Sequence, residues 1–182
     1  MPNPEELWDH LAARACRLLE HARELEPRAQ VRHFGSVLRL WHHPADGPQT
    51  AWTVLAPGKR AEPAATPRVR EVVWDQPADH RRLFAAEAGA LSDRPTLHLR
   101  EADLPAGELE RLLNAGRELS VPLVRVKGPA GLDGEYFGLE TYEVSPSVRV
   151  QWWCDGPVEW RHFTGWVAQL RAYLVDRLSQ GA

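Results

Sequence analysis

The sequence contains no isoleucine, and lysine and asparagine each occur only twice among its 182 residues. Arginine therefore supplies 20 of the 22 basic residues. This skew indicates a GC-rich, bacterial-type coding bias, and the same bias favours the tryptophan codon. The abundance of arginine and the eight tryptophans are consequently not in themselves signs of a function.

Cysteine is scarce as well. Cys16 and Cys154 lie far apart and form no Cys-x-x-Cys motif, which excludes a secreted disulfide scaffold. The acidic N-terminus lacks the basic start and apolar core of a signal peptide, and no run approaches the roughly 20 apolar residues of a membrane span. We expect a cytoplasmic protein with reduced thiols and no membrane contact.

Excess positive charge is also missing. With 22 basic and 25 acidic residues the formal net charge is −3, so no long-range field draws the chain to a phosphate backbone, and we expect no nucleic-acid partner. Charged residues at 26% and hydrophobic residues at 43% are ordinary for a globular protein. No composition shift marks a linker, which predicts a single domain over residues 1–182.

Periodicity predicts the order of elements. Asn3, Pro4 and two acids start a helix over residues 4–25, and hairpin-forming runs follow at residues 36–43 and 49–56. Further strands are predicted at residues 68–74, 95–101, 121–126, 133–144 and 147–153, with helices at 75–89 and 103–119. Strands in consecutive runs favour an α+β fold: a mainly antiparallel sheet of six to seven strands with an N-terminal helix, two middle helices and a long C-terminal helix.

The C-terminal helix has the clearest pattern. Its apolar stripe consists of Trp160, Phe163, Val167, Leu170, Leu174 and Leu178. Gly165 interrupts this helix, and we expect it to permit close approach of a neighbouring element.

The segment before that helix, "RVQWWCDGPVEW", concentrates tryptophan around a cysteine. In a strand, Trp152 and Trp153 point to opposite faces, so they cannot form one aromatic platform. Pro157 in a first helical turn predicts a helix entrance, with free N–H groups near Cys154 that could hold an anion. We interpret the segment mainly as a structural corner, with Trp152, Trp153 and also Trp41 as candidate binding residues.

The polar cluster "WDQPADHRR" is the principal candidate for catalysis. Asp75, Asp79 and His80 follow a predicted strand, and two carboxylates with an imidazole could perform acid–base chemistry or hold a divalent ion. Helix capping by Asp75 with a solvated first turn explains the same residues.

Two histidine patterns suggest metal binding and are better explained otherwise. His42 and His43 diverge on a strand, and we interpret them as solvent-exposed residues at a hairpin end. Glu159 and His162 have the spacing of a di-iron ligand pair, but only one such copy is present. We therefore predict neither a metal site nor a cofactor.

Two hypotheses of function remain open. The first is a cytosolic binding or interaction domain, such as an immunity-like inhibitor or a regulatory partner, which binds another protein or forms a homo-oligomer. The alternative is a hydrolase-type or metal-assisted enzyme whose site is assembled from scattered Asp and His residues, because such sites leave no linear motif. The absence of a catalytic motif favours the first hypothesis without excluding the second.

Overall fold

The computed structural model describes residues 3–21, 34–59, 61–62, 64–85, 94–121, 134–142 and 148–181. In these ranges the helices are α1 (Pro4–Glu20), α2 (Gln76–Ala85), α3 (Ala106–Arg117) and α4 (Arg161–Gln180), with a 3₁₀ turn at Val158–Trp160. The strands are β1 (Phe34–Pro44), β2 (Gln49–Pro57), β3 (Arg68–Trp74), β4 (Leu97–Asp103), β5 (Glu135–Thr141) and β6 (Val148–Trp153). The predicted α+β fold with an antiparallel sheet is thus confirmed.

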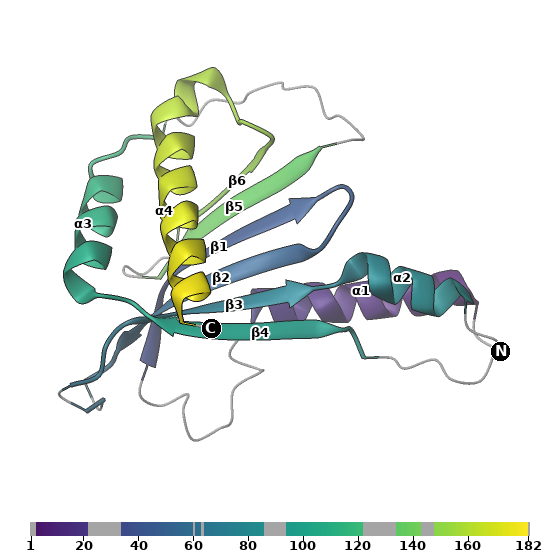
Figure 1. Cartoon of the computed structure of the whole chain (residues 1–182). Coiled ribbons are helices and arrows are strands. Elements are labelled where there is room, and N and C mark those ends of the chain that lie inside the picture. Colours follow the sequence, from purple (N-terminus) through teal and green to yellow (C-terminus); the bar gives the residue numbers. More distant parts are fainter. Residues whose placement is uncertain are drawn as a thin grey trace.

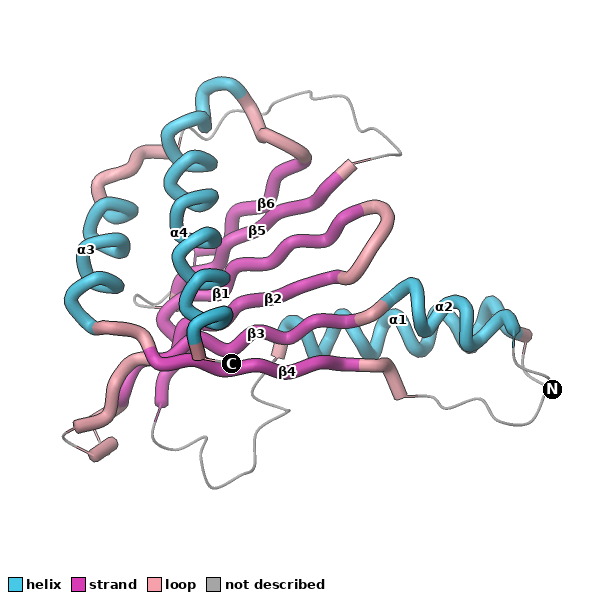
Figure 2. The backbone as a smooth tube through the Cα atoms, in the orientation of Figure 1, coloured by secondary structure: helices cyan, strands magenta, loops and turns pink. Residues whose placement is uncertain are grey.

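All six described strands form one sheet in the order β4-β3-β2-β1-β5-β6, with each neighbouring pair antiparallel. Helices α3 and α4 cover one face, and α1 lies on the other with α2 beside it (Figures 1 and 2). Because side chains alternate along a strand, Leu38 and Leu40 face α4 while Trp41 faces α1. The sheet therefore separates two hydrophobic clusters.

The larger cluster lies between the sheet and α4. Five members of the predicted stripe are buried in it, from Phe163 to Leu178, whereas Trp160 is half-buried at its margin. The sheet contributes Leu38, Leu40, Trp52, Val54, Val69, Leu139 and Trp152. The periodicity of the C-terminal segment thus predicted correctly which side of α4 is buried.

The smaller cluster lies under α1. The side chain of Asn3 accepts a hydrogen bond from the backbone N–H of Glu5, so the predicted cap is confirmed. Leu11, Ala15 and Leu19 are buried against Trp41 and Trp74. The predicted helix also covered residues 22–25, which lie outside the described residues.

Two predictions differ from the structure, and a third concerns residues that lie mostly outside the described ranges. The first helix ends at Glu20 and not near Leu25, with His21 as its C-cap. A Cβ added to Gly165 would meet nothing within 4 Å, so the expected close approach there is wrong. The strand predicted at residues 121–126 falls, apart from Val121, outside the described part of the chain.

Candidate functional site

The two adjacent tryptophans of β6 point to opposite faces, as the alternation predicts. Trp152 is buried and packs edge-on against Phe163 of α4, with ring centroids 5.3 Å apart. Trp153 packs on the other face, where its ring meets Tyr136 at 4.6 Å. Of the two candidates, only Trp152 lies on the side of α4.

A tight corner follows Trp153. Cys154 adopts a left-handed φ of 48° and Gly156 a φ of 71°, and the N–H of Gly156 donates to the carbonyl of Trp153 at 2.9 Å. Pro157 then precedes the 3₁₀ turn, so regular α-helix begins only at Arg161 and later than the proline suggests. The corner carries the chain from the sheet to α4 and leaves Cys154 exposed.

A row of parallel rings crosses three strands beside this corner. The His42 and Phe137 rings stack at 4.6 Å with 8° between their planes, and Phe137 stacks on Trp152 at 5.9 Å and 15°. The register explains the row, because His42 pairs with Phe137 and Phe137 pairs with Trp152 across the ladders. Each face of the Phe137 ring is therefore occupied by a neighbouring ring.

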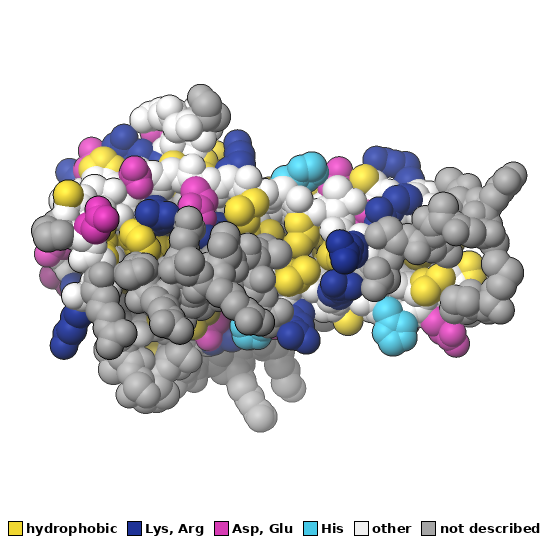
Figure 3. Space-filling view, turned by 90° about the horizontal axis from the view of Figure 1, so that it is seen from below, with side chains coloured by type: hydrophobic (Ala, Val, Ile, Leu, Met, Phe, Trp, Pro, Cys, Tyr) yellow, Lys and Arg dark blue, Asp and Glu magenta, His cyan; other side chains and the backbone are white. Residues whose placement is uncertain are grey.

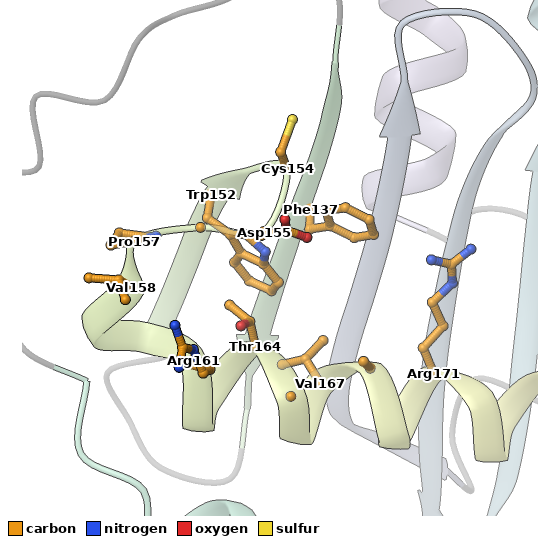
Figure 4. Close-up of a pocket in the computed structure, with 13 residues that line it drawn as sticks. Phe137, Trp152, Cys154, Asp155, Pro157, Val158, Arg161, Thr164, Val167 and Arg171 are labelled. Atoms are coloured by element: carbon orange, nitrogen blue, oxygen red, sulfur yellow. The ribbon is translucent and has the colours of Figure 1, made fainter.

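A groove of about 580 Å³ lies over this row, bounded by α4 on one side and the corner on the other (Figure 4). Phe137 and Trp152 contribute to its lining, and α4 supplies Arg161, Thr164, Gly165, Val167, Ala168 and Arg171. Residues 154–158 complete the lining. The volume falls in the range of about 300–1,000 Å³ that is typical of ligand sites.

The arginines of the groove differ from the paired arginines elsewhere. Arg39 pairs with Glu140 at 3.2 Å and Arg82 with Asp79 at 3.0 Å. By contrast, the guanidinium groups of Arg161 and Arg171 form no hydrogen bond or ion pair in the described part of the chain. Their positive charge is therefore available to a ligand.

Arg171 is the more enclosed of the two. It is half-buried, and its guanidinium carbon lies 5.5 Å from the ring centre of Trp52 and 5.7 Å from that of Phe137. Burial, followed by the charge of Arg171, lowers the pKa of His42, although Glu135 opposes the shift through a 3.0 Å contact with the imidazole. The guanidinium of Arg171 thus lies near His42, Trp52 and Phe137 at this end of the groove.

Asp155 is the one carboxylate among the residues that line the groove. It is exposed and lies on the corner between β6 and the 3₁₀ turn (Figure 4). On the face of the molecule seen from below, basic and acidic side chains of the described residues are mixed, without one dominant sign (Figure 3). The groove, with two arginines and one carboxylate in its lining, therefore has a clearer excess of positive charge than that face.

The structure places Asp75 and Asp79 in structural roles at the start of α2. Asp75 accepts a hydrogen bond from the N–H of Ala78 at 3.0 Å, as a helix cap does. Asp79 is fully buried, and it accepts from Trp74 Nε1 at 2.9 Å and from the hydroxyl of Thr96 at 2.6 Å. The acceptor positions of Asp79 are thus used within the fold.

The remaining candidates are also packed against neighbours. His80 is exposed on α2, with its ring against Trp8 at 5.1 Å and Phe84 at 4.5 Å. Trp41 is buried, and the guanidinium carbons of Arg39 and Arg149 lie 4.6 and 4.9 Å from its ring centre. The Asp–His cluster and Trp41 therefore do not join the groove.

The histidine pair is not exposed as we expected. The imidazoles of His42 and His43 are both partly buried, and burial, with smaller effects from His42 and Arg39, lowers the pKa of His43 to about 4. Within the described ranges no three His, Cys, Asp or Glu side chains are placed to hold a metal ion. The two cysteines are free thiols, and burial together with Glu20 raises the pKa of Cys16.

A second hollow of about 420 Å³ lies between α3, the first half of α4 and the sheet. Its lining is largely apolar and includes Leu113, Val150 and Trp166. Arg117 is its charged residue, and this guanidinium already donates to Asn114 at 2.6 Å. No charge pattern in this hollow selects a ligand.

Sequence reasoning missed Phe137, Arg161 and Arg171. A usable signal was present, because Arg161, Gly165, Ala168 and Arg171 recur at spacings of four, three and three residues. That spacing places them on one side of a helix, where two arginines flank two small residues. The pattern lies beside the apolar stripe, and the stripe predicts only the buried side of the helix.

Comparisons with protein-family models, curated proteins and solved structures found no match for the chain. None of the described helices combines the length and apolar character that crossing a membrane requires.

Proposed function

We propose that the chain is a binding domain that acts by presenting a surface, and that the groove beside α4 is its binding site. The observation that carries this proposal is the pair of arginines without carboxylate partners in the lining of a groove that also contains Phe137 and Trp152. Elsewhere in the described structure, arginines such as Arg39 and Arg100 are held by acidic side chains. Arginine and tryptophan are also the residues that most often dominate binding energy at interfaces.

The shape of the groove supports the same proposal. The two small residues, Gly165 and Ala168, keep the wall low between the two arginines. A Cβ at position 165 would contact nothing, so packing does not explain why this helical position lacks a side chain. Glycine in a helix interior costs about 1 kcal/mol relative to alanine, and open space for a ligand accounts for that cost.

The proposed partner is another protein or a second copy of the chain, and the proposed location is the cytoplasm. Both cysteines are free thiols, which supports a reducing compartment. We do not assign catalysis to Asp75, Asp79 and His80, because the carboxylate of Asp79 already has partners in the fold.

Photo-crosslinking from the rim of the groove tests this function. Cys154 is exposed at the groove, so a benzophenone maleimide can be attached there in a Cys16→Ala background. The matched control carries Cys154→Ser and Ser179→Cys, which moves the probe to an exposed residue in the last turn of α4. Both proteins are irradiated in native lysate.

We expect a stoichiometric adduct, with a partner protein or with a second copy, from position 154 but not from position 179. Ala168→Trp, which fills the groove, should abolish the adduct. Ala172→Trp, on an exposed residue outside the lining, should not. Equal adducts from both probe positions, or an adduct that survives Ala168→Trp, would contradict the proposed function.

A further inference from the structure

We infer that the occupant of the groove is an extended segment of a partner protein that carries acidic side chains about four or five residues apart. This inference rests on the proposed function and adds the chemical class of the partner. It follows from the charge of the groove, from its length and from the way its aromatic rings are arranged.

Charge defines the sign of the ligand. Arg171 is half-buried, with its guanidinium carbon 5.5 Å from the ring centre of Trp52, and it has no acidic partner among the described residues to replace its lost hydration. A carboxylate can accept two parallel hydrogen bonds from a guanidinium, and such charge-assisted bonds are about twice as strong as neutral ones. An acidic side chain from a partner would thus form an ion pair with Arg171, as Glu140 does with Arg39 within the fold.

The separation of the arginines defines the length of the ligand. Arg161 and Arg171 lie ten residues apart on α4, and the close-up shows them at opposite ends of the groove. At 1.5 Å per helical residue their backbones are about 15 Å apart. An extended peptide rises about 3.3 Å per residue, so four to five residues span this distance, whereas one free phosphate or carboxylate does not.

The stacked rings favour a peptide over single-stranded nucleic acid. Proteins bind single strands mainly by stacking bases on the open faces of aromatic rings. Here His42 and Trp152 cover the two faces of Phe137, at 4.6 and 5.9 Å. The lining of the groove instead leaves room over Gly165 and Ala168 for an apolar side chain between the two acidic residues.

The carboxylate of Asp155 should affect how tightly the groove binds an acidic ligand. Its carboxylate stands at the rim of the same groove and has no ion-pair partner among the described residues. It therefore opposes an acidic ligand, and Asp155→Asn should tighten binding a few-fold while the arginine substitutions weaken it.

Selection from a library of random 12-residue peptides displayed on phage, with the full chain as target, tests the inference. The expected result is enrichment of peptides with two Asp or Glu residues four or five positions apart. Synthetic peptides from this pool should bind Arg171→Gln about tenfold or more weakly than the unaltered chain, because the substitution removes a charge-assisted hydrogen bond. Arg81→Gln, an equal loss of charge at an exposed residue of α2, should leave binding unchanged.

Three outcomes would overturn the inference. The first is enrichment of peptides that lack acidic residues and lose their binding in the Ala168→Trp variant. This result would reject the acidic partner and leave the proposed function standing. Competition by oligothymidine or by free glutamate at similar concentrations would reject an extended protein segment. Failure to enrich any peptide would also reject it, and the crosslinking from Cys154 then decides the proposed function separately.

Discussion

Among the described contacts between charged side chains and tryptophan rings, those of Asp79 with Trp74 and of Arg171 with Trp52 differ in whether the charge has an ion-pair partner. At the start of α2, buried Asp79 accepts hydrogen bonds from Trp74 and Thr96 and pairs with Arg82. Across the sheet, Arg171 lies over Trp52 with no acidic partner in the described residues. A charge satisfied within the fold contributes to stability, whereas an unsatisfied charge beside a groove is available for binding.

The largest effect should come from removing the satisfied charge. Asp79→Ala leaves the indole N–H of Trp74 and the hydroxyl of Thr96 without their acceptor in a buried place. We expect the free energy of unfolding to fall by about 3–5 kcal/mol, as when one partner is removed from a buried charged network. Urea denaturation measures this loss.

Asp75→Ala is the matched control, because it removes a helix cap and should cost only about 1 kcal/mol. Equal losses from the two substitutions would mean that Asp79 does not hold the structural role that we assign to it.

A second effect on stability should come from His43, the neighbour of His42 on β1. Burial lowers the pKa of His43 to about 4. In the unfolded chain, His43 takes up a proton near the ordinary histidine pKa of about 6.5. In the folded chain the imidazole stays neutral until the pH falls to about 4. The contribution of His43 to stability is therefore complete above pH 6.5 and is lost as the pH falls from 6.5 through 4. It amounts to roughly 2 kcal/mol after allowance for solvent screening of a partly buried group.

His43→Gln should flatten the decline in unfolding free energy between pH 6.5 and 4, measured by urea titrations at a series of pH values. An unchanged slope would show that His43 is not held neutral in the folded protein.

A smaller effect should separate stability from binding at Gly165. Gly165→Ala adds a methyl group that contacts nothing and improves helix propensity, so we expect stabilisation by about 0.5–1 kcal/mol. The same methyl group enters the groove and should weaken peptide binding.

Gly116→Ala is the contrasting variant, because its Cβ would lie 2.3 Å from an atom of the Trp166 ring and should destabilise the protein. A drop in melting temperature for both variants would show that position 165 is packed rather than open.

The smallest effect on stability should come from the groove arginines themselves. Arg161 and Arg171 have no acidic partners to lose, so the double change to glutamine should alter the free energy of unfolding by less than about 0.5 kcal/mol. Thermal unfolding at matched ionic strength measures this difference. A loss of several kcal/mol would show that the two residues are structural, like Asp79.

The fold could be predicted largely from local patterns. Alternation in β1 and β2, the turn between them and the stripe from Phe163 to Leu178 each reflect the element in which they lie. The split between Trp152 and Trp153 followed from the same rule. The end of α1 was misplaced, because the apolar pattern continues past Glu20 and does not mark where the helix stops.

The groove could not be predicted in the same way, because its residues come from β5, β6, the corner and α4. The spacing of Arg161 and Arg171 indicates one side of a helix, but only the tertiary structure shows that no described carboxylate reaches them. The sequence likewise did not show that Asp79 is fully buried, because a polar run after a strand has the same pattern whether its members are solvated or buried. The residue types indicated possible chemistry at both places. Whether each charge has a hydrogen-bond or ion-pair partner within the fold then separates the structural cluster from the candidate binding site.

An ¹⁵N NMR titration of the full chain with a selected acidic peptide, following the tryptophan indole N–H signals, tests the central comparison most directly. We predict that the Trp152 signal shifts in a saturable way, because this ring lines the groove, while the signal of Trp74 stays in place on its bond to Asp79. A shift of Trp74 with Trp152 unmoved would contradict the assignment of binding to the groove and stability to the Asp79 cluster.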